Sequence, residues 1–566
     1  MKILNIKTYL PALFVAVCMT SCMDDLKNGN IDPNVDAEPN LMGLYSKCYA
    51  GLIMEGNDGN PDFTIDDAGK STLLRNVFNF NELCTDEAIC WWSDGGITEM
   101  SYNNCLAGNA SLKFLYYRLM SNIGYCNHFL ELGEGGETMQ AEVRVIRAYN
   151  YLLMLDFFGN PPFVDAIRTE TPRQAHTYNS NYDASKNYTR AEILAMGREF
   201  MFGWVKGELE AAEPSLLAPA VKKDTDADYG RIDKATAWLL LSRLHLNAGT
   251  YLNNDGQNNP NWQLAFDYAK KIIDSKTYKL FTDDQMSTTA QNLGYHAYDL
   301  LFMGDNGSNG ASCEALLPLL QDGKKTKGWG GSLFFIAAMW NGDMYSVNGK
   351  GAGTTGNNWS GMRCRPQLVG KFFANPTDVE GKTAAEVRAL AGDDRALFWG
   401  KDHTVDLGNN DGFTCGIATP KWNNNYSNDG NPHDSYDVDT DFFLFRVAEA
   451  YLNAAEAAIH LNQTATAKEC LDAIRNRAHA AVKSVYTLND VLDERSRELY
   501  FEGLRRTDLI RFNQFGGEKA TYNWSYKGGN KTGVTFDKKF NVYPIPTSEM
   551  MANSNLVQND GFNDIE

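Results

Sequence analysis

The chain has 566 residues, of which 43% are hydrophobic and 22% are charged, and its formal net charge is −19 at pH 7. This length and composition support a large folded core. The negative charge argues against nucleic acid and anionic membrane surfaces as ligands, because both repel an acidic protein. Neutral sugars carry no such penalty.

The first residues have the order of a secretory signal, with Lys2 and Lys7 before a short apolar run and small residues after it. A run of about ten apolar residues is too short to span a bilayer. The small residues directly before Cys22 resemble a bacterial lipobox, which implies that Cys22 is lipidated; the alternative is a signal peptide with a fortuitous cysteine. We therefore predict a signal peptide over 1–21, a lipidated tether over 22–38, and one domain over 39–566.

Helical periodicity dominates three regions of that domain, and apolar residues recur three and four positions apart in each. The predicted helices cover 140–158, 234–248, and 445–461 followed by 467–478. Alanine stands at close-approach positions and aromatic residues fill the next layer, a pattern similar to tetratricopeptide helix pairs without a clean 34-residue period. The predicted fold class is mostly α, with a tetratricopeptide-like helical scaffold.

A long stretch between the second and third helical regions, about 279–441, is rich in Gly, Asn, Asp, Trp and Tyr. Loop-forming clusters such as 349–358 show that it cannot be regular helix. Its aromatic content argues against disorder, and long irregular excursions of this kind are usually functional. We expect this loop-rich excursion to carry ligand contacts.

The eleven cysteines are scattered and form no CxxC pair, which indicates mostly buried thiols and no disulfide framework. Export would still allow a nearby pair to oxidise, and Cys84 with Cys90 is the first candidate.

Charged and apolar residues alternate at helical spacing over 493–512 and predict two short helices broken near Gly503. Charged side chains three or four apart can pair along these helices. They are Arg495, Glu498, Glu502, Arg505, Arg506 and Asp508. The segment resembles the C-terminal signature of the SusD/RagB family, surface lipoproteins that bind glycans and partner a TonB-dependent transporter in Bacteroidetes. Motifs at 142–149, 230–235, 445–457 and 543–546 resemble the same family in that order.

Three tryptophans, Trp92, Trp329 and Trp359, stand in polar, glycine-bearing settings and on no amphipathic stripe. Glycines beside an indole leave its face open, and the apolar face of a pyranose stacks on such a ring. Burial in the core is the alternative for any single tryptophan. The family resemblance implies that these three rings are the glycan-binding arc, because their segments are similar to the ring-bearing segments of a starch-binding member that has tyrosine at the second position.

The resemblance also implies that Arg75 and Asp67 contact sugar hydroxyls, since charge-assisted hydrogen bonds orient a sugar. An exposed ion or a loop cap is the alternative for each. Gly95 departs from the family pattern, because the starch-binding member has asparagine there, and Asp94 or backbone groups would have to substitute.

Alternating carboxylates at 437–441 offer Asp439 and Asp441 as ligands for a hard cation, and the resemblance implies a structural calcium ion. The segment 305–309, which would supply the other side of the site, matches the family poorly. Turn-forming aspartates are the alternative. No other cofactor is expected.

No pair of carboxylates stands out as a glycosidase pair, and the eight histidines form no HExxH or other metal-ligand spacing. We therefore expect no catalysis. The resemblance implies a surface-exposed lipoprotein of the outer membrane that captures starch or malto-oligosaccharides and delivers them to a SusC-like TonB-dependent transporter. The alternatives are a family member that binds another glycan and a surface glycoside hydrolase.

Overall fold

The computed structural model describes residues 40–56, 59–62, 64–65, 67–408 and 413–564. The chain divides into two units, Met1–Leu44 and Tyr45–Glu566, and nearly all described residues belong to the second. The predicted signal peptide, Cys22 and the tether over 22–38 lie outside the described residues. The domain boundary at residue 39 stays a prediction. In the described ranges, every helix is either too short or too polar to cross a membrane.

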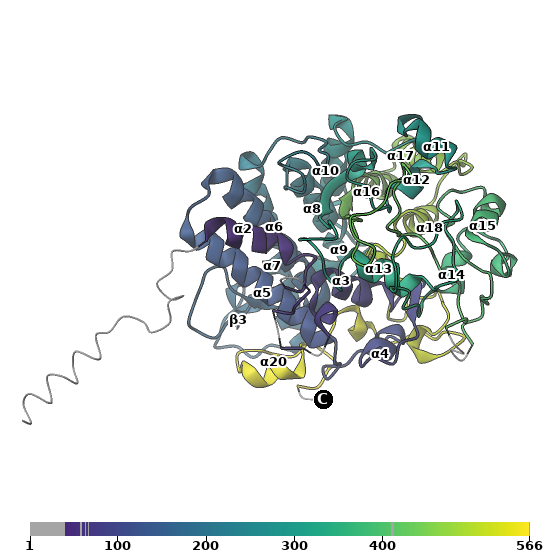
Figure 1. Ribbon diagram of the computed structural model, residues 1–566. Helices are drawn as coiled ribbons and strands as arrows, with labels where there is room; N and C mark the ends of the chain where they lie inside the picture. Colours follow the sequence, from purple (N-terminus) through teal and green to yellow (C-terminus); the bar gives the residue numbers. More distant parts are fainter. Residues whose placement is uncertain (1–39, 57–58, 63, 66, 409–412, 565–566) are drawn as a thin grey trace, which may run out of the picture. The chain divides into compact units, whose positions relative to one another are not determined.

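Long helices build the first half of the second unit, and α6 packs against both α5 and α7 (Figure 1). These helices span Leu112–Leu132 (α5), Gly136–Phe158 (α6) and Arg190–Ala212 (α7). The helix predicted over 140–158 is confirmed, and it begins at Gly136. It ends before Gly159, whose φ of 70° favours glycine. The earlier, shorter helices are α2 (Leu41–Ala50), α3 (Leu73–Glu82) and α4 (Ile97–Ser101).

The second group of helices joins segments that are far apart in the sequence, because α10 packs against both α8 and α16. Ala265 and Ala269 of α10 are fully buried, and they share core clusters with Ala457 and Leu452 of α16. The small residues let the helices approach closely, which confirms the predicted packing of small against large side chains. The helices are α8 (Lys234–Leu246), α9 (Ala248–Asn253), α10 (Trp262–Ser275), α16 (Val447–His460) and α17 (Thr464–Arg477).

The prediction that a helix starts at Phe445 is wrong, because Phe445 and Arg446 belong to strand β6 (Phe442–Arg446). This strand pairs antiparallel with β4 (Ala315–Leu319), and Leu317 lies opposite Phe445. Aromatic residues fit a buried, pleated surface well. The partner strand is distant in sequence, so the local helical period of 445–461 contained no sign of it.

In its described residues, the loop-rich excursion over 279–441 contains short helices and two short strands joined by irregular segments, which confirms that it is not regular helix. The helices are α11 (Thr288–Asn292), α12 (Ala297–Leu300), α13 (Ser332–Met339), α14 (Pro366–Val369) and α15 (Ala384–Ala391). Two further antiparallel strand pairs are β1 (Ala88–Cys90) with β5 (Met362–Cys364) and β2 (Pro162–Phe163) with β3 (Arg173–Gln174).

The signature segment forms α18 (Leu488–Leu499) and α19 (Arg505–Arg511), and Gly503 between them has a φ of 80°, as the predicted break requires. The expected pairing of charges three residues apart is found for Asp508 with Arg511 at 2.7 Å and for Glu494 with Arg497 at 2.9 Å, but the two arginines after the break pair with other parts of the fold. Arg505 binds Asp86 at 2.6 Å, and Arg506 binds Asp156 at 3.0 Å. Because both arginines are buried, their compensating charges come from other elements of the fold. The last helix is α20 (Thr547–Ala552).

All nine cysteines in the described part of the chain are free thiols, and eight of them are buried. Cys84 and Cys90 are both buried and form no disulfide with each other. Burial raises the pKa of Cys84 to about 11, which keeps this thiol protonated and unreactive at neutral pH.

Candidate functional site

Two of the three tryptophans meet because strands β1 and β5 pair, with Cys90 opposite Met362. Beyond the strand ends, the Trp91 backbone N–H donates to the Gly361 carbonyl at 3.0 Å. The indole Nε1–H of Trp92 donates to the Ser360 carbonyl at 2.8 Å. The ring centres of Trp92 and Trp359 are therefore 6.3 Å apart, with their planes at 58°.

The third ring, Trp329, comes from the excursion and lies 6.4 Å from Trp359, with an angle of 28° between the planes. Its backbone N–H donates to Oε1 of the buried Glu55 at 2.7 Å. Gly69 permits this approach, because a Cβ there would lie 2.9 Å from the Trp329 Cβ. Trp359 is thus the central ring of a tryptophan cluster (Trp92, Trp329, Trp359), and all three side chains are half-buried.

Sequence reasoning missed a fourth ring, Tyr436, which meets Trp329 edge-on at 5.8 Å between ring centres. Tyr436 is 41% exposed. The signal that could have found it is its setting, an aromatic residue inside a run of Asn, Asp, Ser and Gly like the runs around the tryptophans. Phe334 lies on the buried side of the cluster, with its ring centre 6.1 Å from that of Trp92.

Arg75 of α3 lies beneath the cluster and is 5% exposed. Its Cζ lies 5.7 Å from the Trp92 ring centre and 4.9 Å from that of Phe334. Its Nη1 is 3.6 Å from Oδ2 of Asp67, too long for a hydrogen bond, and its buried Nε–H has no acceptor among the described residues. Burial lowers the pKa of this guanidinium from its ordinary value. A buried cation with so few partners is stabilised by any hydrogen-bond acceptor that a ligand brings.

Asp67 and Asp94 join the site through Lys70, which sequence reasoning did not identify. Lys70 Nζ lies 2.8 Å from Oδ1 of Asp94 and 4.0 Å from Oδ2 of Asp67. Asp67 also accepts the Gly69 N–H at 3.0 Å and so caps the short 3-10 helix η3 (Ala68–Ser71). The loop-cap alternative thus describes one role of this residue, and Oδ2 remains directed toward Arg75.

Gly95 borders a neighbouring surface pocket of about 430 Å³ that is also lined by Lys70 and Lys113. Its carbonyl accepts the Ser111 hydroxyl at 3.1 Å. The polar residues predicted for the site therefore lie close together beside the tryptophan cluster, with Arg75 against Trp92 and Asp67 next to Gly69, which contacts Trp329. Flat apolar rings beside charged hydrogen-bonding groups suit a sugar, which has apolar faces and hydroxyl edges.

The predicted calcium ligands have oxygen-rich surroundings. Oδ2 of Asp441 accepts the Tyr229 hydroxyl at 2.6 Å, and Oδ2 of Asp439 accepts the Tyr426 hydroxyl at 2.9 Å. The 305–309 segment does lie against Asp441, because the Asn306 side-chain amide donates to its carbonyl at 2.8 Å. Burial raises the pKa of Asp441 to about 7, and the charges of Asp224 and Asp439 add to this rise. Crowded carboxylates and hydroxyls are a donor set that fits a hard cation such as Ca²⁺.

Comparison with known proteins shows to which family the chain is related. A family model described as the SusD family matches residues 371–562. Starch-binding protein SusD of Bacteroides thetaiotaomicron is 34% identical over 608 aligned positions, which cover 99% of this chain and 100% of that protein. The chain belongs to the SusD family. The predicted family is therefore confirmed.

Solved structures agree on the SusD-like fold. A SusD-like carbohydrate-binding protein from Bacteroides fragilis has a TM-score of 0.63 at 18% identity, covering 92% of this chain and 99% of that one. Surface glycan-binding protein A from B. thetaiotaomicron, in complex with laminarihexaose, has a TM-score of 0.61 at 17% identity, covering 92% and 98%. The mostly helical, SusD-like fold class is confirmed. SusD family glycan-binding proteins are non-catalytic, in agreement with the expectation that this chain is not an enzyme.

Proposed function

We propose that this SusD family protein captures starch or malto-oligosaccharides at the tryptophan cluster. The observation that carries the proposal is the row of three half-buried indoles, with successive ring centres 6.3 and 6.4 Å apart. A row of rings at this spacing offers an extended apolar surface on which several sugar units of one chain can stack. The 34% identity to a starch-binding protein over the whole length supports α-glucan as the ligand class.

The polar groups complete the proposed site. Arg75 would donate to sugar hydroxyls, and Asp67 and Asp94 would accept from them, with Lys70 holding both carboxylates. Gly95, which has no side chain, would leave space for the glycan at the edge of the tryptophan cluster. Lipidated Cys22 would anchor the protein in the outer membrane, facing outward, and a SusC-like TonB-dependent transporter would receive the glycan.

The second candidate is capture of a different glycan. It is favoured by Gly95, which removes a side-chain contact relative to the family pattern. It also fits the fact that one structural neighbour was solved with laminarihexaose.

Isothermal titration of the lipid-free protein, starting after Cys22, separates the two candidates. We expect maltoheptaose and α-cyclodextrin to bind, with the modest affinity typical of flexible sugars. Laminarihexaose should not bind under the same conditions. Binding of laminarihexaose with no response to either α-glucan would replace the starch proposal with the second candidate.

We also propose that Ca²⁺ binds between Asp439, Asp441 and the 305–309 segment as a structural ion. A ligand that binds only the folded state stabilises it, by about 2.7 kcal/mol when its concentration is 100 times Kd. We therefore expect 1 mM Ca²⁺ to raise the thermal unfolding midpoint of chelator-treated protein by a few degrees. Mg²⁺ at 1 mM is the control, because it is too small for such a site. An equal midpoint with Ca²⁺, with Mg²⁺ and without either ion would contradict the proposal.

A further inference from the structure

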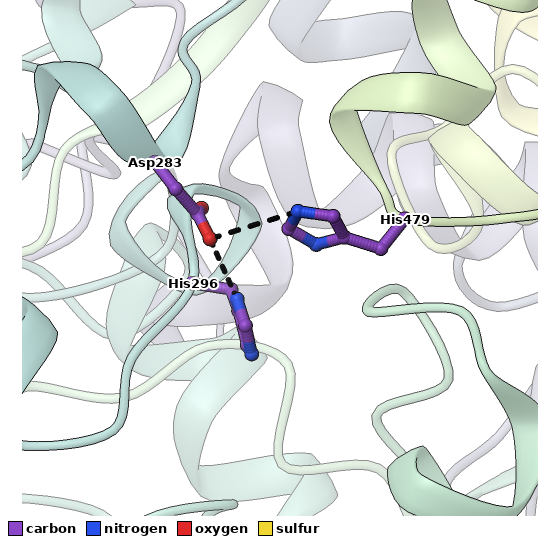
Figure 2. Close-up of side chains that lie close together, drawn as sticks. All are labelled: Asp283, His296 and His479. Atoms are coloured by element: carbon purple, nitrogen blue, oxygen red, sulfur yellow. Dashed lines mark hydrogen bonds and ion pairs between the residues drawn. The ribbon is translucent and has the colours of Figure 1, made fainter.

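A cluster of Asp283, His296 and His479 (the His–Asp cluster) has no part in the proposed glycan site. Asp283 begins the 3-10 helix η6 (Asp283–Gln285), His296 precedes α12, and His479 follows α17. Figure 2 shows one oxygen of the Asp283 carboxylate joined by dashed lines to both imidazoles. Oδ2 of Asp283 lies 2.8 Å from Nδ1 of His296 and 3.9 Å from Nε2 of His479.

The spacing of these atoms suits a small divalent ion. One ligand atom from each residue lies within 4.8 Å of the other two. Zinc binds nitrogen and carboxylate oxygen at about 2.0–2.1 Å in a tetrahedron, so its ligand atoms are about 3.4 Å apart. The observed separations of 2.8 and 3.9 Å lie on either side of that value. Shifts of about half an ångström would therefore bring these two separations to the value of a tetrahedral site.

A further carboxylate orients one of the imidazoles. Oδ2 of Asp394 lies 2.6 Å from Nδ1 of His479, and the Asp394 side chain is 9% exposed. Its backbone N–H donates to the carbonyl of Ala478, so Asp394 is tied to the residue before this histidine. In the neutral imidazole whose Nδ1–H donates to Asp394, the lone pair of His479 is on Nε2, the nitrogen that lies 3.9 Å from Asp283. Metal-bound histidines use this arrangement, in which the second ring nitrogen donates to a carboxylate.

A hydrogen bond also orients the carboxylate of Asp283. Its Oδ1 accepts the Ala297 N–H at 2.7 Å, so Oδ2 is the oxygen that faces both histidines. The side chains of Asp283 and His296 are 33% and 36% exposed, and that of His479 is 54% exposed. An ion can therefore reach the cluster directly from solvent.

We propose that the His–Asp cluster binds one Zn²⁺ ion through Asp283 Oδ2, His296 Nδ1 and His479 Nε2. Asp394 acts as a positioning residue for His479, and the fourth coordination position is open to water. Two imidazoles with one carboxylate favour zinc over Ca²⁺, which prefers oxygen ligands alone. The bound ion links the start of the loop-rich excursion to the end of α17, two segments nearly 200 residues apart.

The test uses chelator-treated protein without a histidine tag, titrated with Zn²⁺ in competition with a fluorescent zinc chelator. We expect one site per chain, and a loss of at least about 100-fold in affinity for His296→Ala and for His479→Ala. His128→Ala is the matched control, because His128 is an exposed histidine outside the cluster and should leave the affinity unchanged. Asp394→Asn should weaken binding by about 10- to 100-fold, the range seen for carboxylates that orient metal-bound histidines.

Thermal unfolding of the metal-free variants shows whether each is folded, and anomalous diffraction at the zinc edge locates the ion. A peak between Asp283, His296 and His479 supports the proposal. Equal affinity in the wild type and in the His296→Ala/His479→Ala double variant overturns it, as does a peak at another position. The cluster would then be an ion-pair network of histidines and aspartates only.

Discussion

Replacing Trp359 by alanine is expected to weaken α-glucan binding by at least about 30-fold, which corresponds to about 2 kcal/mol. Trp359 is the central ring, and its removal separates Trp92 from Trp329. The variant should fold, because the backbone N–H groups of Trp359 and Ser360 bind the carbonyl of Ala337 independently of the indole. Titration with maltoheptaose measures the loss.

Two further variants make this result specific. Trp359→Phe keeps a flat ring and should retain part of the affinity. Trp262→Ala removes an equally half-buried indole that stacks on His460 instead, and it should bind like the wild type. Full affinity in a folded Trp359→Ala protein would show that the glycan binds elsewhere.

Glu498→Gln is expected to lower the free energy of unfolding by about 3–5 kcal/mol, the usual effect of removing one partner from a buried ion pair. Oε1 of Glu498 accepts from Arg446 at 3.1 Å and from Arg477, and Oε2 accepts from Arg395 at 3.4 Å. All four side chains are at most 1% exposed. Glutamine keeps the shape but turns an amide donor toward buried guanidinium groups. Denaturant unfolding measures the change.

The control is Asp564→Asn, which removes an exposed partner of Arg190 and should change stability by less than about 1 kcal/mol. If Glu498→Gln and Asp564→Asn lowered the free energy of unfolding by the same small amount, the buried ion pairs of Glu498 would contribute no more stability than a surface ion pair.

The lowered pKa of the Glu498 carboxylate predicts how the free energy of unfolding depends on pH. Burial alone would raise the pKa of Glu498, but the charges of Arg477, Arg446 and Arg395 outweigh it and lower the pKa to about 2. Because the folded-state pKa is below the ordinary value of 4.5, this contribution is present above pH 4.5 and is lost as pH falls toward 2. Glu498→Gln should therefore flatten the acid side of the stability curve between those values.

The sequence by itself determined the helical scaffold and the family. Helical periods are local, since each depends on residues three and four apart, and for this reason the helix at 140–158 and the break at Gly503 were predictable. The glycine-rich, polar settings of the three tryptophans are local features too. Those settings, together with the family resemblance, were enough to select Trp92, Trp329 and Trp359 as candidates.

Only the tertiary structure decided which distant residues meet. Strand β6 replaces the start of a predicted helix because its partner, β4, is more than 100 residues away. Tyr436 and Lys70 enter the candidate site, and the His–Asp cluster forms, through packing between separate segments. Most charges of α18 and α19 pair across the fold for the same reason, since buried ions need fixed opposite charges, and the pairs along the helices, Glu494 with Arg497 and Asp508 with Arg511, satisfy only some of them. Such contacts depend on long-range packing. A local pattern in a single sequence does not show which distant segments pack together.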